Sequence, residues 1–360
     1  MTRFDFAVIG AGIAGLATAA ALSREGRVAL VEQEEQPCYH SSGRSAAIFV
    51  RSYGSAAVQA LTARSATLFA EAEAQGLFTA LAPPRGVMVV VPHGSEASGE
   101  APFRTRIDAH EAAALMPCLD PVRLDHAWWE PSARDIDVHA MQTGYLRELR
   151  AAGGELIAAA PLSRAEHRGK LWHLTAGVRE IAVPIVVNAA GAWADPVARL
   201  FGAAPLGIRP LRRSAAVIDV PERLAPGHWP MIVDADETVY FKPEAGRLML
   251  SPADSTPVEP HDCWPEDLDI AIAVDRYERL TGASVHRVHH RWAGLRSFAV
   301  DENPVIGTDP SVPGLYWAAG LGGFGVQTAP AIADFLLRLV IGSDTASELQ
   351  AAIDPGRIEA

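Results

Sequence analysis

A glycine-rich turn near the N-terminus is the first pattern with a chemical meaning. Gly10, Gly12 and Gly15 form a G-x-G-x-x-G motif between an apolar run and an Ala- and Leu-rich segment. Such glycines permit a tight turn and let the backbone approach a pyrophosphate at the start of a helix. Glu32 follows about 20 positions later, where a carboxylate can bind a ribose 2′-hydroxyl and would repel a 2′-phosphate. The pattern predicts an adenine-dinucleotide site and favours FAD or NAD over NADP.

Arginines in apolar surroundings form the second pattern. Arg296 stands in a Trp-Ala-Gly-Leu run, and a guanidinium can bind a carboxylate through two parallel hydrogen bonds, which lysine cannot do. A surface ion pair is the alternative for Arg296. Arg212 and Arg213 are adjacent on a predicted strand, so their side chains point to opposite faces and only one of them can face a pocket.

Metal ligands and paired thiols are not indicated. His286, His289 and His290 lack the carboxylate partner at i, i+4 spacing that a zinc motif needs. The three cysteines contain no CxxC pair, so we expect neither a disulfide framework nor a cysteine zinc site. Few cysteines fit a reducing cytoplasm.

Composition limits the class of protein. The chain has 360 residues, of which 49% are apolar and 21% charged, as in a folded protein with one large or two medium domains. With 31 basic and 43 acidic residues its formal charge is -12, which disfavours nucleic acid and anionic membranes as partners. We expect no transmembrane segment and no signal peptide. Attachment to a membrane through a protein partner stays open.

The periodicity of apolar residues predicts the main elements. Residues 4–9, 13–22 and 27–32 form a β-α-β unit of a parallel sheet. Alternation over residues 211–251, with a turn at 243–246, predicts antiparallel strands. Further helices are expected at residues 56–75, 109–115, 138–152 after the capping residue Asp137, and 329–341. Further strands are expected at residues 87–91, 155–160, 172–178, 185–188 and 315–319.

Four segments together point to a family. Residues 40–47 (HSSGRSAA), 188–193 (NAAGAW), 292–298 (WAGLRSF) and 320–325 (GLGGFG) resemble the D-amino acid oxidase superfamily of FAD-dependent oxidoreductases. Within it the chain is most similar to bacterial D-arginine and D-amino acid dehydrogenases, from the N-terminus to about Leu339. The resemblance implies FAD as the cofactor. The rival reading, an NAD-dependent dehydrogenase, requires neither the Ser/Gly/Arg loop nor the C-terminal glycine loop.

The expected fold class is α/β, with a Rossmann-type FAD-binding domain and a second, α+β substrate domain that contains a mixed or antiparallel sheet. We assign residues 1–80, 132–200 and 297–360 to the discontinuous FAD-binding domain. Residues 81–131 and 201–296 are assigned to the substrate-binding domain.

The resemblance also implies roles for individual residues. Arg296, Tyr240, Arg213 and Tyr53 are expected at the catalytic centre, with Arg296 as the carboxylate clamp and Arg213, rather than Arg212, facing the pocket. Core packing is the alternative for both tyrosines. Ile48, Val50, Val87 and Gly323 are expected in the substrate pocket. The FAD site is expected to comprise Gly10, Gly12, Ala14, Gly15, Glu32, Gln33, Ser41, Arg44, Ser45, Ala46, Ala47, Ala190, Gly191, Trp193, Gly322, Gly323, Phe324, Gly325, Val326, Gln327 and Thr328.

The pocket residues predict a substrate preference. Relatives that favour cationic D-amino acids carry His and Thr where this chain has Ile48 and Val50, and Glu where it has Val87. Burying a substrate cation against Val87 without a counter-charge is costly, so we expect a neutral, apolar or aromatic side chain. An acidic substrate is the second choice, because Arg51 and Arg85 are near in sequence. The missing His and Thr leave open how the loop that contains Ile48 and Val50 is ordered.

The expected reaction is oxidative deamination of a D-amino acid. The neutral amine form gives up the Cα hydrogen as hydride to flavin N5, and the 2-imino acid is hydrolysed to a 2-keto acid and ammonia. N-methyl or cyclic amino acids and 2-hydroxy acids are alternative substrates, and a non-catalytic dinucleotide-binding scaffold is the alternative of another class. The electron acceptor, whether quinone, dye or oxygen, and the oligomeric state stay undetermined.

Overall fold

A mainly parallel sheet forms the centre of the first of two lobes. The computed structural model describes residues 1–221, 224, 227–343 and 347–358. The sheet has the order β10-β3-β2-β14-β22-β21, and only its edge strand β21 is antiparallel to its neighbour. The predicted β-α-β unit is confirmed, because β2 and β3 pair in parallel on either side of α1 in the sequence. The strands are β2 (Phe6–Ile9), β3 (Val28–Val31), β10 (Glu155–Ile157), β14 (Ile185–Asn188), β21 (Val305–Thr308) and β22 (Leu315–Ala319).

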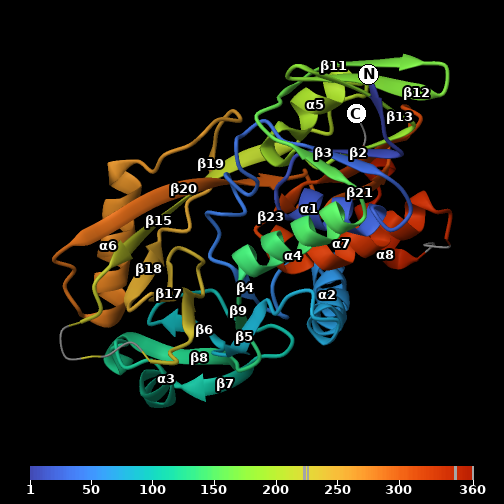
Figure 1. Ribbon diagram of the computed structural model, residues 1–360. Coiled ribbons are helices and arrows are strands. Elements are labelled where there is room, and N and C mark those ends of the chain that lie inside the picture. The colour runs from blue at the N-terminus through green and yellow to red at the C-terminus, as the bar shows by residue number, and fades with distance from the viewer. Residues whose placement is uncertain (222–223, 225–226, 344–346, 359–360) are drawn as a thin grey trace.

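Helices cover one face of this sheet (Figure 1). Every residue of α1 (Ile13–Leu22) is buried, because the helix packs in one apolar core with the sheet and its neighbouring helices. Asp137 caps α4 as predicted, since its carboxylate accepts the N–H of Ala140 at 2.8 Å. The other helices on this face of the sheet are α2 (Ala56–Ala74), α4 (Val138–Ala151), α7 (Gly325–Val340) and α8 (Glu348–Ile353).

Helix α7 begins at Gly325, so the predicted start at residue 329 was wrong. Pro330 lies inside the helix, where it removes one backbone hydrogen bond. Burial of Ala329, Ile332 and Leu336 in the core outweighs that loss. Because α7 begins at Gly325, its first turn follows directly on the glycine loop, residues 320–325.

A small sheet covers the other face of the parallel sheet. It has the order β1-β13-β12-β11, and Trp172 and Leu174 from it pack against Trp317 of β22 in a second apolar core. Its strands are β1 (Thr2–Arg3), β11 (Leu162–Arg168), β12 (Leu171–Ala176) and β13 (Arg179–Val183). The helical segments on this side are η2 (Gly191–Trp193), α5 (Ala194–Leu200) and η3 (Pro355–Arg357).

A ten-stranded mixed sheet builds the second lobe, on the left of Figure 1. Its order is β23-β20-β15-β18-β17-β16-β6-β8-β7, with β19 paired to β15, and β16 and β6 are parallel. The predicted mixed sheet is confirmed. Its strands are β6 (Val87–Pro92), β7 (Thr105–Asp108), β8 (Leu124–Glu130), β15 (Arg209–Ile218), β16 (Met231–Asp234), β17 (Tyr240–Glu244), β18 (Arg247–Ser251), β19 (Thr256–Pro257), β20 (Val288–Phe298) and β23 (Leu321–Gly322).

One face of the ten-stranded sheet carries helices and the other faces the first lobe. Tyr277 of α6 (Asp267–Thr281) packs edge-on against Phe241 of β17 at 5.0 Å between ring centroids. The remaining helical segments of this lobe are α3 (Ala109–Leu115) and η1 (Pro121–Arg123). A three-stranded sheet, with the order β4-β9-β5, is formed by β4 (Ile48–Phe49), β5 (Leu81–Pro84) and β9 (Arg134–Ile136). The division of the chain into an FAD-binding domain and a substrate-binding domain at the residues given above stays a prediction.

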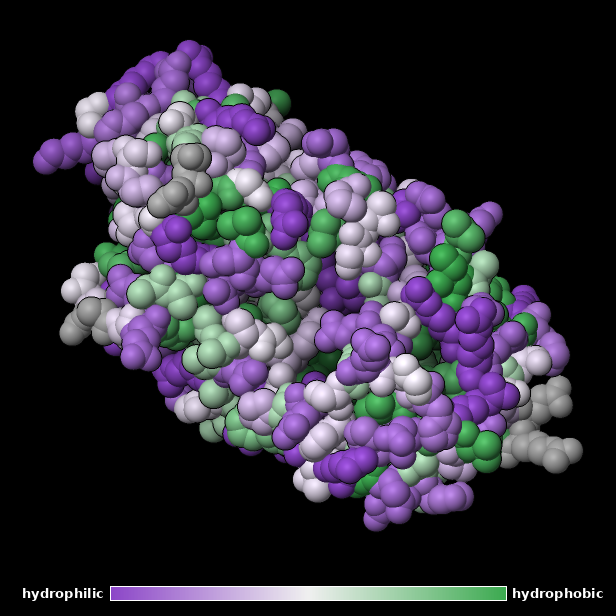
Figure 2. Space-filling view, turned by 180° about the vertical axis from the view of Figure 1, so that it is seen from behind, coloured by the Kyte–Doolittle hydropathy of each residue, from purple (hydrophilic) through white to green (hydrophobic). Residues whose placement is uncertain are grey.

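The face of the molecule seen in Figure 2 is mostly polar. Figure 2 shows hydrophilic residues over most of one face, with hydrophobic residues in small groups between them. Among the helices in the described part of the chain, none has the length and apolar character needed to cross a bilayer.

Candidate functional site

A cavity of about 1190 Å³ lies between the two lobes. It is lined by the glycine turn before α1, by residues of the 40–47 loop, by the loop before α7, and by strands β6, β15, β16, β17 and β20. Pockets for small molecules usually measure about 300–1000 Å³. This cavity is therefore large enough for a dinucleotide together with a small second molecule.

Nearly all the residues predicted for the site line this cavity, although they come from distant parts of the chain. Gly15 and Thr328 do not: a Cβ on Gly15 would lie 1.9 Å from the carbonyl oxygen of Gly10, and the Thr328 hydroxyl donates to the carbonyl of Phe324 at 2.9 Å within α7. The predicted residues that line the cavity are Gly10, Gly12, Ala14, Glu32, Gln33, Ser41, Arg44, Ser45, Ala46, Ala47, Ile48, Val50, Tyr53, Val87, Ala190, Gly191, Trp193, Arg213, Tyr240, Arg296, Gly322, Gly323, Phe324, Gly325, Val326 and Gln327.

The glycine turn forms an open cradle at one end of the cavity. Gly10 has φ +99°, and a Cβ there would lie 2.6 Å from the carbonyl oxygen of Ala189, so only glycine fits. A Cβ on Gly12 would meet only the Ser42 hydroxyl within 4 Å, at 3.5 Å. The space beside Gly12 is therefore free for a phosphate at the start of α1.

Glu32 lies directly after β3 and is only 8% exposed. One carboxylate oxygen accepts the N–H of Ala11 at 2.6 Å and the other accepts the N–H of Glu34 at 3.0 Å. Each oxygen retains acceptor capacity, so the fixed carboxylate can still bind a ribose hydroxyl. These features fit the adenosine half of a dinucleotide.

The 40–47 loop ties the cradle to strand β20. The Ser41 hydroxyl donates to the carbonyl of Leu295 at 2.6 Å, and Arg44 pairs with Asp262 at 2.6 Å and donates to the carbonyl of Ala293 at 3.0 Å. The side chains of Ser41 and Arg44 thus hold protein groups, although both residues also line the cavity. Their contacts with FAD stay a prediction.

Ser42 is a site residue that the sequence prediction missed. Its hydroxyl accepts the N–H of Ile13 at 3.0 Å and so satisfies one free amide of the first turn of α1. The signal was its place in the Ser-Ser-Gly-Arg loop, but sequence alone does not tell which of two adjacent serines reaches the helix.

Arg296 projects from β20 into the other end of the cavity. Its Nη1 donates to the hydroxyl of Tyr53 at 3.1 Å, and no carboxylate of the described residues lies within ion-pair distance of it. Burial opposes the charge, but the electrostatic effects of Tyr53 and Tyr240, the hydrogen bond with Tyr53 and the carboxylate of Glu237 together raise the pKa of Arg296. The result is a fixed, charged guanidinium that can receive a carboxylate.

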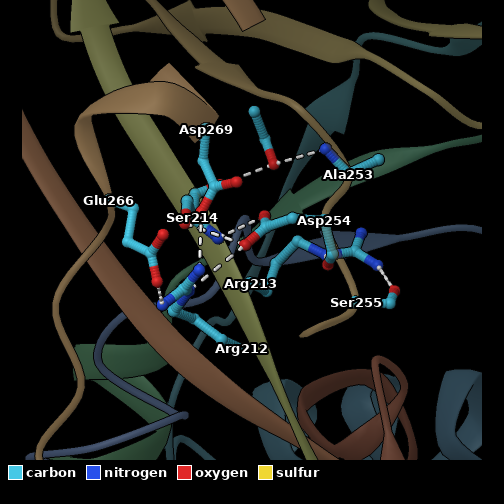
Figure 3. Close-up of polar contacts among 9 residues, drawn as sticks. Arg212, Arg213, Ser214, Ala253, Asp254, Ser255, Glu266 and Asp269 are labelled. Carbon is cyan, nitrogen blue, oxygen red and sulfur yellow. Dashed lines mark hydrogen bonds and ion pairs between the residues drawn. The ribbon is translucent and has the colours of Figure 1, made fainter. Parts of the chain in front are cut away.

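Arg213 lies on the cavity side of β15, and Arg212 lies on the opposite side (Figure 3). Arg212 pairs with Glu266 at 2.6 Å and Asp269 at 2.8 Å. Arg213 donates to the carbonyl of Asp254 at 2.6 Å and to the Ser255 hydroxyl at 3.1 Å. Burial and the like charge of Arg296 lower the pKa of Arg213. The cavity thus holds two neighbouring guanidinium groups, neither of which is paired with a carboxylate side chain in the described structure.

An apolar wall borders the two arginines. Val87 of β6 pairs in register with Met231 of β16, and Val89 pairs with Val233, and all four side chains line the cavity. Tyr240 of β17 follows, with the Arg213 guanidinium 6.0 Å from its ring centroid. Sequence reasoning found Val87 but missed its three neighbours, because the parallel pairing of β6 with β16 joins segments far apart in the chain.

Arg51 and Arg85, on which the alternative of an acidic substrate rests, do not line the cavity. The Arg51 guanidinium stacks 4.1 Å over the ring of Phe103, and Arg85 pairs with Asp135 at 2.6 Å. Arg104, which sequence reasoning missed, does line the cavity; it donates to the Ser52 hydroxyl at 3.1 Å. The exposed Glu237 also lines it. Within the described residues no group of three or more His, Cys, Asp or Glu side chains is arranged to hold a metal ion.

The fold and the cavity are those of a dinucleotide-binding protein, and comparison with known proteins supplies the family. The chain belongs to the family of FAD-dependent oxidoreductases, since the family described as "FAD dependent oxidoreductase" matches residues 5–339. FAD is therefore the cofactor. The open cradle beside Gly12, the fixed carboxylate of Glu32 and the volume of the cavity fit this group.

Individual relatives are distant. The chain is 26% identical over 174 residues to FAD-dependent oxidoreductase domain-containing protein 1 of Bos taurus, a match that covers 44% of this chain and 35% of that protein. The chain thus spans about a third of the length of this curated relative.

Two solved structures have the same fold over nearly their whole length. L-proline dehydrogenase from P. horikoshii has a TM-score of 0.85 at 20% identity, covering 99% of this chain and 98% of that one. Glycine oxidase from Geobacillus kaustophilus has a TM-score of 0.84 at 21% identity, covering 98% of each chain. The D-arginine dehydrogenase branch within the family stays a prediction.

Proposed function

We propose that the protein oxidises the Cα–N bond of an amino acid with a neutral, apolar or aromatic side chain. The observation that carries the proposal is the pair Arg296 and Arg213, two guanidinium groups without carboxylate partners among the described side chains, in a cavity continuous with the FAD cradle. Charged groups are rarely buried without a partner. A substrate carboxylate is the partner that this arrangement can accept.

Each residue has a role that follows from its contacts. Arg296 offers two parallel N–H donors to the carboxylate, and Arg213 adds a second positive charge beside it. The Tyr53 hydroxyl accepts from Arg296, so its own proton is free to donate to the carboxylate. Tyr240 lines the same region and contributes a phenol hydroxyl towards the substrate.

Bound FAD supplies the two-electron acceptor that takes hydride from the substrate Cα. The chain's own residues need only fix the carboxylate and exclude a charged side chain, and the amine must be neutral. Conversion of the amino acid to the 2-imino acid removes two electrons and two protons, as the Cα hydride and one proton from nitrogen. The 2-imino acid then leaves and reacts with water, without further oxidation, to form a 2-keto acid and ammonia.

The apolar wall supports a neutral side chain. Val87, Val89, Met231 and Val233 offer no counter-charge to a substrate cation. The D configuration rests on the resemblance of residues 40–47, 188–193, 292–298 and 320–325 to the D-amino acid oxidase superfamily, and we propose it on that basis. Oxygen, a quinone or a dye can serve as the electron acceptor.

A second candidate is a secondary amine as the substrate, in the form of an N-methyl or cyclic amino acid. It is favoured by the fold shared with an L-proline dehydrogenase. The carboxylate clamp would be used in the same way, and only the space around the nitrogen would differ.

Anaerobic reduction of the purified holoprotein tests the proposal. The panel contains D- and L-forms of alanine, phenylalanine, methionine, glutamate and arginine, together with sarcosine and proline, and bleaching of the flavin absorbance is followed in each case. We expect the fastest bleaching with a neutral D-amino acid. D-arginine as the best substrate would contradict the side-chain preference, and no bleaching by any amine would contradict the function.

A further inference from the structure

The segment between β4 and α2 is held by side chains from distant parts of the chain. Three successive amides donate to side-chain oxygens: Val50 N–H to Gln327 at 3.0 Å, and Arg51 N–H and Ser52 N–H to Glu130 at 2.9 Å and 3.3 Å. Sheet pairing of β4 ends at Phe49. The side chains of Glu130 and Gln327 therefore supply the acceptors that these buried or partly buried amides need.

Glu130 is the charged member of this arrangement and is 0% exposed. It ends β8, opposite Val87 of β6, and it accepts a third hydrogen bond from the Ser132 hydroxyl at 3.3 Å. No basic side chain in the described part of the chain lies within ion-pair distance of its carboxylate. A buried carboxylate is costly unless hydrogen bonds satisfy it, so the Arg51 and Ser52 amides and Glu130 stabilise each other.

The next residue, Tyr53, is part of the proposed active site. Its hydroxyl accepts from Arg296 at 3.1 Å, and its ring packs against Phe324 at 4.7 Å between centroids. Arg104 adds a further bond to the same segment, through the Ser52 hydroxyl. The position of the Tyr53 hydroxyl beside the carboxylate clamp thus depends on where the peptides of residues 51 and 52 are held.

We propose that Glu130 is a positioning residue, which places Tyr53 against Arg296 by fixing the two preceding backbone amides. This inference rests on the proposed carboxylate clamp. The same contacts explain how the loop can be ordered although Ile48 and Val50 are aliphatic and supply no polar side chains. The ordering comes from backbone amides that bind Glu130 and Gln327.

Replacing Glu130 by glutamine tests the contribution of the carboxylate with little change in side-chain size. Glu130→Gln keeps the volume, but one of its two terminal atoms becomes an NH₂ donor. That atom would face a backbone N–H of residue 51 or 52, so one hydrogen bond is replaced by two opposed donors. The segment must then shift, and Tyr53 with it.

The experiment compares Glu130→Gln with the control Ser132→Ala, which removes only the third hydrogen bond to the same carboxylate. The holoproteins are titrated with benzoate, a simple carboxylate, and binding is followed by the change in flavin absorbance. We expect Glu130→Gln to raise the benzoate dissociation constant and the KM for the best amino acid by about tenfold or more, with a smaller change in kcat. Ser132→Ala should stay within about twofold.

A double-mutant cycle separates positioning from a general loss of structure. In the Tyr53→Phe background, which lacks the hydroxyl that contacts Arg296, Glu130→Gln should raise the benzoate dissociation constant by less than about threefold. Equal fold-changes in the two backgrounds would overturn the proposal. If Glu130→Gln does not fold, Glu130→Asp keeps the charge but withdraws the oxygens, and an unchanged benzoate affinity in this variant would also overturn it.

The two proposals fail in different ways. If no amine reduces the wild-type flavin, the proposed function fails, while the benzoate titration still tests Glu130. If the wild type is reduced by an amino acid and Glu130→Gln binds benzoate as the wild type does, only the positioning role fails.

Discussion

Replacing Gly323 by alanine is a test of the clamp that leaves the clamp residues themselves in place. A Cβ on Gly323 would lie 2.8 Å from Nη1 of Arg296, 2.9 Å from its Cζ and 3.1 Å from the hydroxyl of Tyr53. Ordinary contacts begin at about 3.4 Å, so the guanidinium must move by roughly 0.6 Å or more. Gly323 has no positive φ, so alanine brings no backbone strain there.

The expected cost follows from that displacement. Arg296 and Tyr53 are flexible at the atoms that clash, so the fold should tolerate the methyl group and the melting temperature should change little. The substrate carboxylate would lose well-aligned charge-assisted hydrogen bonds, each worth about 1.5–3 kcal/mol. A misplacement of about 1 Å can cost 100-fold in rate. We therefore expect kcat/KM to fall by roughly 10- to 100-fold.

Steady-state and anaerobic stopped-flow kinetics measure this, with thermal unfolding of the holoprotein as the check on folding. Gly227→Ala is the control, since the nearest atoms to its Cβ are in Trp229 at 3.8 Å and 3.9 Å. A Gly323→Ala variant with kcat/KM within twofold of the wild type would refute the placement of the carboxylate between Arg296 and Tyr53.

Four further outcomes are expected. Arg296→Ala should weaken substrate binding by about 1.5–3 kcal/mol, roughly 13- to 160-fold in KM, and an unchanged KM and kcat would remove Arg296 from the site. Glu32→Gln should weaken FAD retention by roughly tenfold or more in a fluorescence titration of the apoprotein, and wild-type affinity would contradict the ribose contact. The rate of flavin reduction should rise with pH through the ionisation of the substrate amine, because only the neutral amine gives up hydride, and a flat profile would contradict this order of events. Burial raises the pKa of both Cys38 and Cys118 to about 12, so these thiols should resist a disulfide reagent in the native protein at about pH 8 and react after unfolding; rapid native labelling at either position would contradict their burial.

Local patterns in the sequence predicted the dinucleotide half of the protein well. The predicted helix at residues 13–22 matches α1, and the strands on either side of it pair in parallel. The glycine motif and Glu32 could be found because the turn, the helix start and the strand end that form this cradle lie within one short stretch of chain. Hydrophobic period and glycine spacing are local properties, so sequence reveals them directly.

The other end of the cavity depends on contacts that no local pattern contains. Tyr53 and Arg296 are 243 residues apart along the chain, and Glu130 reaches Ser52 across 78 residues. The start of α7 was misplaced for a related reason, because burial against other helices overrides the local effect of Pro330.

The sequence by itself determined which chemical groups the protein has: the glycine turn, the acid that follows it, and arginines set among apolar residues. Only the tertiary structure decided which side chains share a space, namely that Met231 and Val233 continue the wall begun by Val87 and that Glu130 holds the loop before Tyr53. The physical reason is that residue type and spacing act along the chain, whereas the cavity is formed by strand pairing and burial between segments that the sequence keeps far apart.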